Sequence, residues 1–585
     1  MLIIGISDSH NSTACAYEDG QLSAAVAEER LTRVKNWMGF PVKSIQECLR
    51  ISGRRIEDVD AVALTGLAVP FPYPTREAII NAFRGTNGTS PGLHRARRAL
   101  VESIYKGRVR DIYRSTSFWK KRDRNRWRER IAGVTALGVP EDKVMIVEHH
   151  TAHASAAYYG WGKFDDDVLV LTNDGGGDSL CATVNIGRAG KLERIAAVHW
   201  WESIGMVYAM TTCILGMVPL EHEYKLMGMA PYAGARSSEE VFKDLRALFE
   251  FDGADGIVWK RRGDLPEAFG SYDYLRRLFE LRRFDAICGG LQRFVEEFVT
   301  QWIKNCIRAT GIRRVALAGG LFMNVKLNKI IMELPEVTDL FVYPSCGDET
   351  NAMGAAYNVY AQLADYRSMS PLRDFYTGPE YSDAQIREAI DNYRFDRPVS
   401  VQETDDIEGE VAQLLARGEV VARFKGREEF GARAMGNRSI LADPSRPEVV
   451  KLINDAIKSR DFWMPFAPSL LDRREQDYAV NQKNVAAPYM IMAFDSTDRA
   501  NEFRAACHPY DLTIRPQVVY RDWNPSYYDL LEKFERLTGR GIVLNTSFNL
   551  HGYPIVSRPE DALHVLDQSG LAWLAIGNFL LHKQT

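Results

Sequence analysis

The chain has 585 residues, of which 46% are hydrophobic and 26% charged, and its formal net charge at pH 7 is −4. This length exceeds what one hydrophobic core normally supports, so we expect at least two globular domains. The slightly acidic balance excludes a general attraction to nucleic acid or to anionic membranes, so any anion site must be built locally. Eight scattered cysteines without a C-x-x-C pair argue against a zinc ribbon or a disulfide framework.

No part of the sequence approaches the ~20 consecutive apolar residues of a membrane-spanning helix, and the first residues carry no basic leader. Together with the cysteine pattern, this predicts a cytoplasmic protein with no membrane partner.

The first thirty residues alternate short apolar runs with turns: "LIIGIS", "DSHNST", "ACAYE", "DG" and "LSAAVAEE". This pattern predicts three strands joined by turns. A looser copy occupies residues 168–198, and an aspartate follows the first strand of each copy, Asp8 and Asp174. The repeat indicates a duplicated, two-lobed α/β fold whose ligand lies between the lobes, with two unrelated hairpins as the alternative.

Residues 91–130 contain fourteen Lys or Arg against four Asp or Glu, with Trp119 and Trp127 among them. A solvated helical insertion is the favoured interpretation of this segment, and a nucleic-acid surface is the alternative.

Three histidines lie in the segment "EHHTAHASAAYY", whose residues 149–159 are predicted to form a helix. On a helix His149 and His153 share one face, while His150 turns away by about 100°. A zinc peptidase would need a glutamate at position 150 as general base, so that chemistry is not favoured. Packed helical histidines without a metal are the plain alternative.

Two carboxylates favour a metal. Asp174 and Asp348 each follow a predicted buried strand, and such loops open at one edge of an α/β sheet. A set of two histidines and two aspartates suits Fe(II), Mn(II) or Zn(II). Cys346 is expected to be a packed residue and not a ligand.

Residues 313–331 and 339–363 are predicted as strand, loop and helix units, and the polar stretch 364–385 is the predicted domain boundary. A P-loop is absent. Gly319, Gly320 and Asn324, in the first of these units, could admit a nucleoside against bare backbone, although a Gly-Gly pair after a strand is often only a turn.

From residue 386 a second series of helices and strands begins, and here cations lie among glycines and apolar residues. They are Lys425, Arg427, Arg433, Arg438, Lys458, Arg460 and Arg515. A predicted buried strand ends in "LNTSFN", with the short polar side chains Asn545, Thr546, Ser547 and Asn549. This combination indicates a pocket for a polyphosphate or an acyl phosphate, with ion pairs inside the domain as the alternative.

These segments resemble the NodU/CmcH-type O-carbamoyltransferase family, which includes the tobramycin, cephamycin, novobiocin, geldanamycin and nodulation carbamoyltransferases. The matching motifs are "HNSTACAYEDG", "AEERLTRVK", "HHTAHASAAYY", "YKLMGMAPY", "AGGLFMNVKLN", "GDETNAMGAA", "FGARAMGNRSILADP", "IKSRDFWMPFAPS" and "LNTSFNLHGYPIV". The resemblance implies an actin-like ATPase-type domain over residues 1–370, with the basic insertion at about 85–130, and a YrdC-like α/β domain over residues 386–585.

The resemblance further implies that the second domain forms carbamoyl-adenylate from ATP and carbamoyl phosphate. The first domain would then transfer the carbamoyl group to a hydroxyl of a small-molecule natural product, as in antibiotic biosynthesis. By matching motifs, His149, His153, Asp174 and Asp348 would bind Fe²⁺ or a similar divalent metal, and Mg²⁺ would accompany ATP. Gly319, Gly320 and Asn324 would lie near adenosine, while Arg433, Lys458, Arg515, Asn545 and Ser547 would bind carbamoyl phosphate and ATP.

His10 is expected to face the transfer site and is a candidate base, and Lys458 and Ser547 are the expected catalytic residues of the second domain. The chain departs from the family pattern at Met464, where an arginine is usual, and Arg460 or Arg438 is expected to compensate. It also departs at Tyr224, a usual glycine, and over residues 505–515.

Three other functions remain as alternatives: an actin-like sugar kinase, a tRNA threonylcarbamoyl-type modifying enzyme, and a binding protein without activity. No nucleic-acid partner is expected. The motifs specify neither the acceptor nor the oligomeric state, for which a homodimer is one option.

Overall fold

The computed structural model describes residues 1–67, 75–85, 127–262, 266, 270–458 and 460–584. Most of the basic segment 91–130, including Trp119, lies outside the described residues, so the prediction of a helical insertion stays a prediction.

Two five-stranded sheets form the N-terminal region, which we define as residues 1–363. The first has the order β3-β2-β1-β4-β5 and the second the order β8-β7-β6-β11-β12. The strands of the first sheet are β1 (Leu2–Ser7), β2 (Thr13–Glu18), β3 (Gln21–Ala27), β4 (Ala61–Thr65) and β5 (Val144–Val147). Those of the second are β6 (Val168–Gly177), β7 (Leu180–Arg188), β8 (Lys191–His199), β11 (Arg314–Ala318) and β12 (Asp339–Val342).

The two sheets repeat one topology. In each, the first strand pairs antiparallel with a hairpin of two strands on one side, and two further strands continue parallel on the other side. The predicted internal duplication and the α/β class are therefore confirmed. One detail differs: β3 ends at Ala27, because the last two residues of "LSAAVAEE" begin the short helix α1 (Glu28–Thr32).

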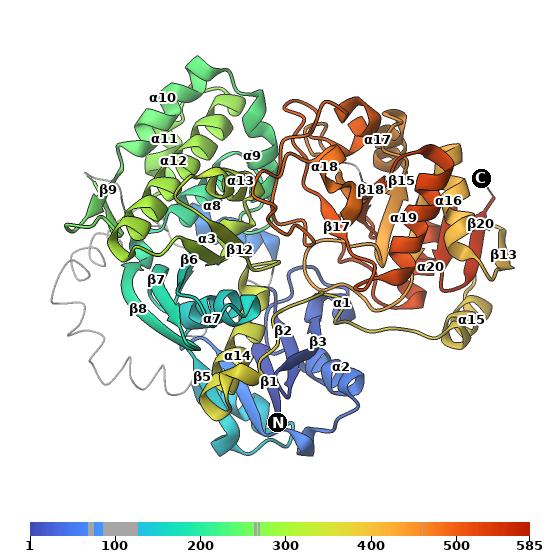
Figure 1. The fold of residues 1–585 in the computed structure, drawn as a ribbon, viewed down its shortest axis with the longest axis horizontal. Helices are drawn as coiled ribbons and strands as arrows, with labels where there is room; N and C mark the ends of the chain where they lie inside the picture. Colours follow the sequence, from blue (N-terminus) through green and yellow to red (C-terminus); the bar gives the residue numbers. More distant parts are fainter. Residues whose placement is uncertain (68–74, 86–126, 263–265, 267–269, 459, 585) are drawn as a thin grey trace.

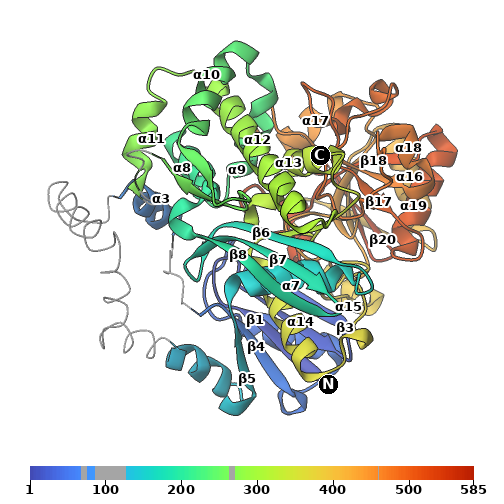
Figure 2. The ribbon, with the colours of Figure 1, turned by 60° about the vertical axis from the view of Figure 1, so that its left-hand side comes forward.

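The last strand of each sheet leads into a helix, and these two helices pack against each other between the sheets (Figure 2). They are α7 (His149–Trp161) after β5 and α14 (Asn351–Leu363) after β12. The helices cross closely at Gly354, where a Cβ atom would lie 1.9 Å from the carbonyl oxygen of Ala152. Any side chain at position 354 would push the helices apart.

Further helices of the N-terminal region flank the sheets. The long helix α12 (Phe284–Thr310) packs against α10 (Ala235–Arg246), α9 (Glu223–Met229) and α13 (Val325–Glu333), while α8 (Ile204–Ile214) packs against β6. On the first sheet, α2 (Val42–Ser52) covers β2 and β3.

The C-terminal region, which we define as residues 383–584, contains an eight-stranded mixed sheet and lies beside the two N-terminal sheets (Figure 1). Its strands follow the order β13-β20-β19-β14-β15-β18-β16-β17. They are β13 (Val399–Glu403), β14 (Val421–Phe424), β15 (Arg438–Ala442), β16 (Ala467–Leu471), β17 (Gln517–Val519), β18 (Ile542–Ser547), β19 (Trp573–Ile576) and β20 (Phe579–Lys583). Helices α16 (Ile407–Arg417) and α19 (Pro525–Thr538) belong to one core cluster, and α17 (Glu448–Ile453) and α20 (Pro559–Gln568) to another.

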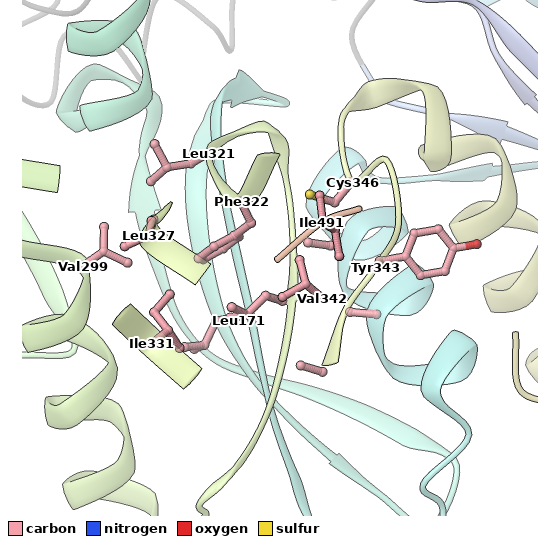
Figure 3. Close-up of a cluster of buried hydrophobic side chains, with 14 of the residues drawn as sticks. Leu171, Val299, Leu321, Phe322, Leu327, Ile331, Val342, Tyr343, Cys346 and Ile491 are labelled. Carbon is pink, nitrogen blue, oxygen red and sulfur yellow. The ribbon is translucent and has the colours of Figure 1, made fainter. Parts of the chain in front are cut away.

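Part of the C-terminal region packs into the core of the N-terminal region. Ile491 lies among Phe322, Val342 and Cys346 in the buried cluster that Figure 3 shows. The backbone oxygen of Ile491 accepts a hydrogen bond from Nδ2 of Asn328 at 2.7 Å. The two regions therefore share one apolar interior and do not meet only at their surfaces. Cys346 is packed there, as expected.

A buried ion pair also joins the regions. Nη1 of Arg30, on α1, lies 2.7 Å from Oε1 of Glu428, and both side chains are only 3% exposed. Nη2 of Arg30 donates to the backbone oxygen of Gly431 at 2.7 Å, and the hydroxyl of Ser557 donates to the second carboxylate oxygen of Glu428. Arginine suits this place because its fork donates to two acceptors at once.

All eight cysteines are buried and free, so the expectation of no disulfide framework is met. Among the residues that the structure describes, no helix combines the length and apolar character that crossing a membrane requires.

The Arg30–Glu428 pair yields a stability prediction. Arg30→Ala leaves a buried carboxylate without its cation, so we expect the variant to lose about 3–5 kcal/mol of unfolding free energy. Replacing both partners, as Arg30→Met with Glu428→Leu, removes the uncompensated charge and should restore most of that loss. Urea denaturation followed by tryptophan fluorescence measures both.

The matched control is Arg188→Ala, which breaks the exposed pair with Asp167. Solvent screens that pair, so unfolding should stay unchanged. Equal losses for Arg30→Ala and Arg188→Ala would contradict the importance of the buried pair.

Candidate functional site

A cavity of about 940 Å³ lies between the N-terminal and C-terminal regions and is lined by residues of both. Most of the side chains that the sequence singled out line it: His10, His149, Asp174, Gly320, Asn324, Asp348, Arg433, Lys458, Arg460, Arg515 and Ser547. Residues far apart in the sequence thus come together around one space.

His149, His153, Asp174 and Asp348 form a compact group at this cavity, here called the His/Asp quartet. One ligand atom from each can be chosen so that all four lie within 4.8 Å of one another. Oδ2 of Asp174 is 2.9 Å from Nε2 of His149 and 3.3 Å from Nε2 of His153. Oδ1 of Asp348 is 3.6 Å from each of these nitrogens.

Local structure positions each member of the quartet. Glu148 caps α7, because its side chain accepts a hydrogen bond from the backbone N–H of Thr151 at 2.7 Å, and this places His149 on the first turn. The sequence predicted a loop around Asp174, whereas β6 continues to Gly177 with a register shift after Asn173. That irregularity re-aims the Asp174 side chain toward α7.

His150 points away from the quartet, as the helical spacing predicted. Its Nδ1 lies 2.8 Å from the hydroxyl of Thr172, which in turn lies 2.6 Å from the hydroxyl of Thr183. Burial, followed by the neighbouring His149, lowers the pKa of His150 to about 3. A neutral His150 therefore packs α7 against β6.

The donor set fits a divalent metal. Ligands about 2.1 Å from one ion lie roughly 3–3.4 Å apart, and the separations in the quartet are close to this range. Burial lowers the pKa of His149, but Asp348 and Asp174 outweigh burial and raise it to about 10. Carboxylates that hold a proton on an imidazole in this way would equally hold a cation in its place.

His10 lies at the same cavity, in the turn after β1. Its Nε2 is buried and has no hydrogen-bond partner among the described residues. Burial lowers the pKa of its imidazole despite the nearby carboxylate of Asp348. A neutral imidazole with a free nitrogen can accept a proton, as a general base must.

Asp8, the counterpart of Asp174 in the first repeat, does not join the quartet. Its carboxylate accepts from Nε and Nη2 of Arg130 at 2.7 and 2.8 Å, and both side chains are buried. Arg130 also donates to the backbone oxygens of Thr65 and Gly66. The equivalent position in the first half of the fold is thus already neutralised.

Four cations of the C-terminal region face the cavity: Arg433, Lys458, Arg460 and Arg515, here called the cation set. Within the described part of the chain, none of them forms an ion pair with a carboxylate. Burial, then the neighbouring Arg433 and Arg460, lowers the pKa of Arg515 well below its ordinary value. Like charges gathered without counter-ions favour an anionic ligand.

Lys458 and Ser547 are in direct contact. The Lys458 ammonium donates to the hydroxyl of Ser547 at 3.1 Å and to Oδ1 of Asn549 at 2.8 Å. Burial, followed by the nearby Arg460, lowers the pKa of Lys458 well below its ordinary value. Nη2 of Arg460 donates to the hydroxyl of Thr546 at 3.0 Å, so the end of β18 orients two cations.

Three predicted residues have structural tasks. A Cβ on Gly319 would lie 2.3 Å from the backbone oxygen of Asn173, so Gly319 permits close packing on β6 and does not itself line the cavity. Asn324 caps α13 and exchanges hydrogen bonds with Gln292. Asn545 lies off the cavity lining and donates to the backbone oxygen of Ala434 at 3.1 Å.

The two residues expected to compensate for Met464 behave differently. Arg460 lines the cavity beside Met464. Arg438 is fully buried, packs over the ring of Phe424 at 3.7 Å and donates to backbone oxygens, among them that of Gly426. Of the two alternatives, only Arg460 lines the cavity, so Arg460 is the one whose position allows it to compensate for Met464.

Sequence reasoning missed several residues of the cavity. Tyr224 and Lys35, both from the N-terminal region, line it together with the cation set. Asn351 lies against the quartet, 3.2 Å from Nε2 of His153. Tyr224 and Asn351 occur inside the recognised motifs "YKLMGMAPY" and "GDETNAMGAA". The motifs could therefore have pointed to these two residues, but they did not indicate what either residue does.

Comparisons with known proteins agree with this geometry. Residues 2–357 match the family model described as carbamoyltransferase N-terminus, and residues 412–583 match carbamoyltransferase C-terminus. Nodulation protein NolNO of Sinorhizobium fredii is 30% identical over 580 residues, which cover 98% of this chain and 79% of that protein. Nodulation protein NolO of Bradyrhizobium diazoefficiens is 32% identical over 440 residues, covering 75% and 79%.

Among solved structures, full-length HypF in its phosphate- and nucleotide-bound form shares 13% identity, with a TM-score of 0.33 and coverage of 63% of this chain and 56% of that one. Likeness at this level supports no conclusion about what this chain binds. The family models, by contrast, cover both regions of the chain, and the resemblance of the motifs is confirmed. The chain therefore belongs to the carbamoyltransferase family and is a carbamoyltransferase enzyme.

Proposed function

We propose that this enzyme is an ATP-dependent O-carbamoyltransferase with two linked sites. The cation set would bind ATP and carbamoyl phosphate while carbamoyl-adenylate forms. The His/Asp quartet would hold a divalent metal such as Fe²⁺ where the carbamoyl group is transferred to a hydroxyl of a small-molecule acceptor. The observation that carries the proposal is that the cation set and three members of the quartet, His149, Asp174 and Asp348, line one cavity.

The cation set suits the first step. Arg460, Arg433 and Arg515 offer planar forks that match phosphate oxygens, and Lys458 adds a compact charge beside Ser547. Because none of these groups forms an ion pair with a carboxylate of the described residues, a polyphosphate would be their counter-ion and would favour their charged forms. Preorganised cations of this kind stabilise developing negative charge without reorganisation.

The N-terminal side of the cavity suits the second step. When bound, a metal would supply a positive charge for the phosphate of the AMP leaving group. His10 would accept the proton of the acceptor hydroxyl through its unpartnered Nε2. A cavity shared by both regions would also keep a reactive mixed anhydride away from bulk water.

We further propose that residues 1–370 form an actin-like domain and residues 386–585 a YrdC-like domain of a cytoplasmic enzyme. The repeated sheet topology over residues 2–342 and the separate eight-stranded sheet over residues 399–583 support this division. A sugar kinase would not need the cation set of the C-terminal region, so the cavity gives no support to that alternative.

The two-site proposal predicts separable defects. Lys458→Ala and Ser547→Ala should slow ATP–pyrophosphate exchange in the presence of carbamoyl phosphate by about 10²–10³-fold, because each removes a donor to developing charge. His149→Ala should retain exchange and lose carbamoyl transfer. Radiolabelled pyrophosphate measures exchange, and formation of carbamoylated product with an acceptor panel measures transfer.

Lys533→Ala is the control, because that ammonium pairs with Asp406 and Asp529 and does not line the cavity. Its exchange rate should equal that of the wild type. Loss of exchange in His149→Ala would contradict separate sites for the two steps.

The cation set also predicts that removing one of its charges affects the melting temperature and the affinity for an anion in different ways. Arg515→Ala removes one of several mutually repelling charges, so the melting temperature of the free protein should stay constant or rise. Its affinity for inorganic pyrophosphate should fall about 10–150-fold, the equivalent of one charge-assisted hydrogen bond of about 1.5–3 kcal/mol. Differential scanning fluorimetry with and without pyrophosphate measures both.

Arg540→Ala is the matched control, since Arg540 pairs with Asp443 at 2.8 Å and does not line the cavity. It should lower the melting temperature and leave pyrophosphate binding unchanged. If Arg515→Ala behaves like Arg540→Ala, Arg515 has a structural role and not a binding one.

A further inference from the structure

Asn351 is a buried amide that directly adjoins the His/Asp quartet. It is the first residue of α14 and is 1% exposed. Its Nδ2 atom lies 3.2 Å from Nε2 of His153 and 3.5 Å from Nδ1 of His149. Its Oδ1 atom is buried and has no hydrogen-bond partner among the described residues. One end of the amide therefore meets the quartet, and the other end is unsatisfied.

This orientation conflicts with a metal in the quartet. The lone pair of Nε2 in His153 is the atom that a metal would use, so it could no longer accept a hydrogen bond from the amide N–H. The amide nitrogen would then be unsatisfied and would also present its positive end to a cation. Rotating the amide by half a turn exchanges oxygen and nitrogen, so that the oxygen faces the quartet and the positive end of the amide turns away from a cation.

The distances agree with a ligand position. The amide atom that faces the quartet is 3.2 Å from Nε2 of His153. The quartet's own contacts between ligand atoms are 2.9 Å, 3.3 Å and, twice, 3.6 Å. Atoms about 2.1 Å from one ion have this spacing. The contact with His153 therefore has the spacing expected for an oxygen ligand at this position, while the contact with His149 is made to Nδ1 on the other side of its ring.

We propose that Asn351 is a fifth protein ligand of the metal and binds through its carboxamide oxygen. Carboxamide oxygen is a hard donor that suits Fe(II) or Mn(II) beside imidazole and carboxylate. Asn351 lies three positions after Asp348, so the short segment at the start of α14 would supply two ligands, as α7 supplies His149 and His153. This inference rests on the proposed metal centre.

The chain offers a matched control on the same helix. Asn358 lies two turns after Asn351, and its Nδ2 donates to the hydroxyl of Ser155 on α7 at 3.0 Å. Both asparagines thus join α14 to α7 through their amide nitrogens, but Asn358 touches no member of the quartet in the described structure. Asn358→Ala removes an equivalent helix contact and leaves the proposed ligand set complete.

The experiment is a Co(II) titration of metal-free, full-length protein, read by visible absorption and by the dissociation constant. Asn351→Ala should bind Co(II) about 10–100-fold more weakly than the wild type. Its absorption should intensify and shift, because losing a ligand lowers the coordination number. Asn351→Asp should restore binding, since it keeps an oxygen donor at the same place. Asn358→Ala should match the wild type in both readouts.

Three results would overturn the inference. If Asn351→Ala binds Co(II) with wild-type affinity and an unchanged spectrum, Asn351 is not a ligand while the quartet remains a metal site. If Asn351→Ala and Asn358→Ala weaken binding equally, the effect comes from helix packing. If the wild-type protein binds no Co(II), Fe(II) or Mn(II), the metal centre and the inference fail together.

Discussion

The close crossing of α7 and α14 is the constraint on which the rest of this structure depends. Each helix follows the last strand of one repeat, and Gly354 lets their backbones approach where Ala152 faces it. Both helices then begin at the same edge of the paired sheets, so their first turns converge on the quartet. Helix N-termini carry partial positive charge, and this favours the carboxylates of Asp174 and Asp348 there.

The C-terminal region completes the site by adding the opposite chemistry. Its cations face a cavity whose other wall carries carboxylates and imidazoles, and the two walls are held in register by Arg30, Glu428 and the apolar contacts of Ile491. Buried cations without counter-ions cost folding free energy, which the large shared core offsets. An anion that bridges the two walls would reduce that cost. Geometry and electrostatics therefore both support the proposal of one shared reaction space.

Much of this arrangement was predictable from sequence, for identifiable reasons. Helical spacing separated His149 and His153 from His150, and the repeated strand pattern predicted the duplicated topology. The directions of some side chains depend on long-range contacts that the local pattern does not contain. Arg438 donates to backbone oxygens inside its own region, and Nδ2 of Asn545 donates to a backbone oxygen away from the cavity lining. A cation pattern along the chain shows charge but not which way each side chain points, and only the fold settles that.

The pair of Asp8 and Arg130 shows how the two copies of the repeated fold differ at equivalent positions. Asp8 and Asp174 occupy equivalent places in the two copies, and at Asp8 the chain itself supplies the positive partner as the guanidinium of Arg130. The guanidinium of Arg130 thus occupies, in the first copy, the place that corresponds to the proposed metal position in the second copy. The two halves keep the same backbone topology, but only the second half has an aspartate that could take part in the proposed metal site.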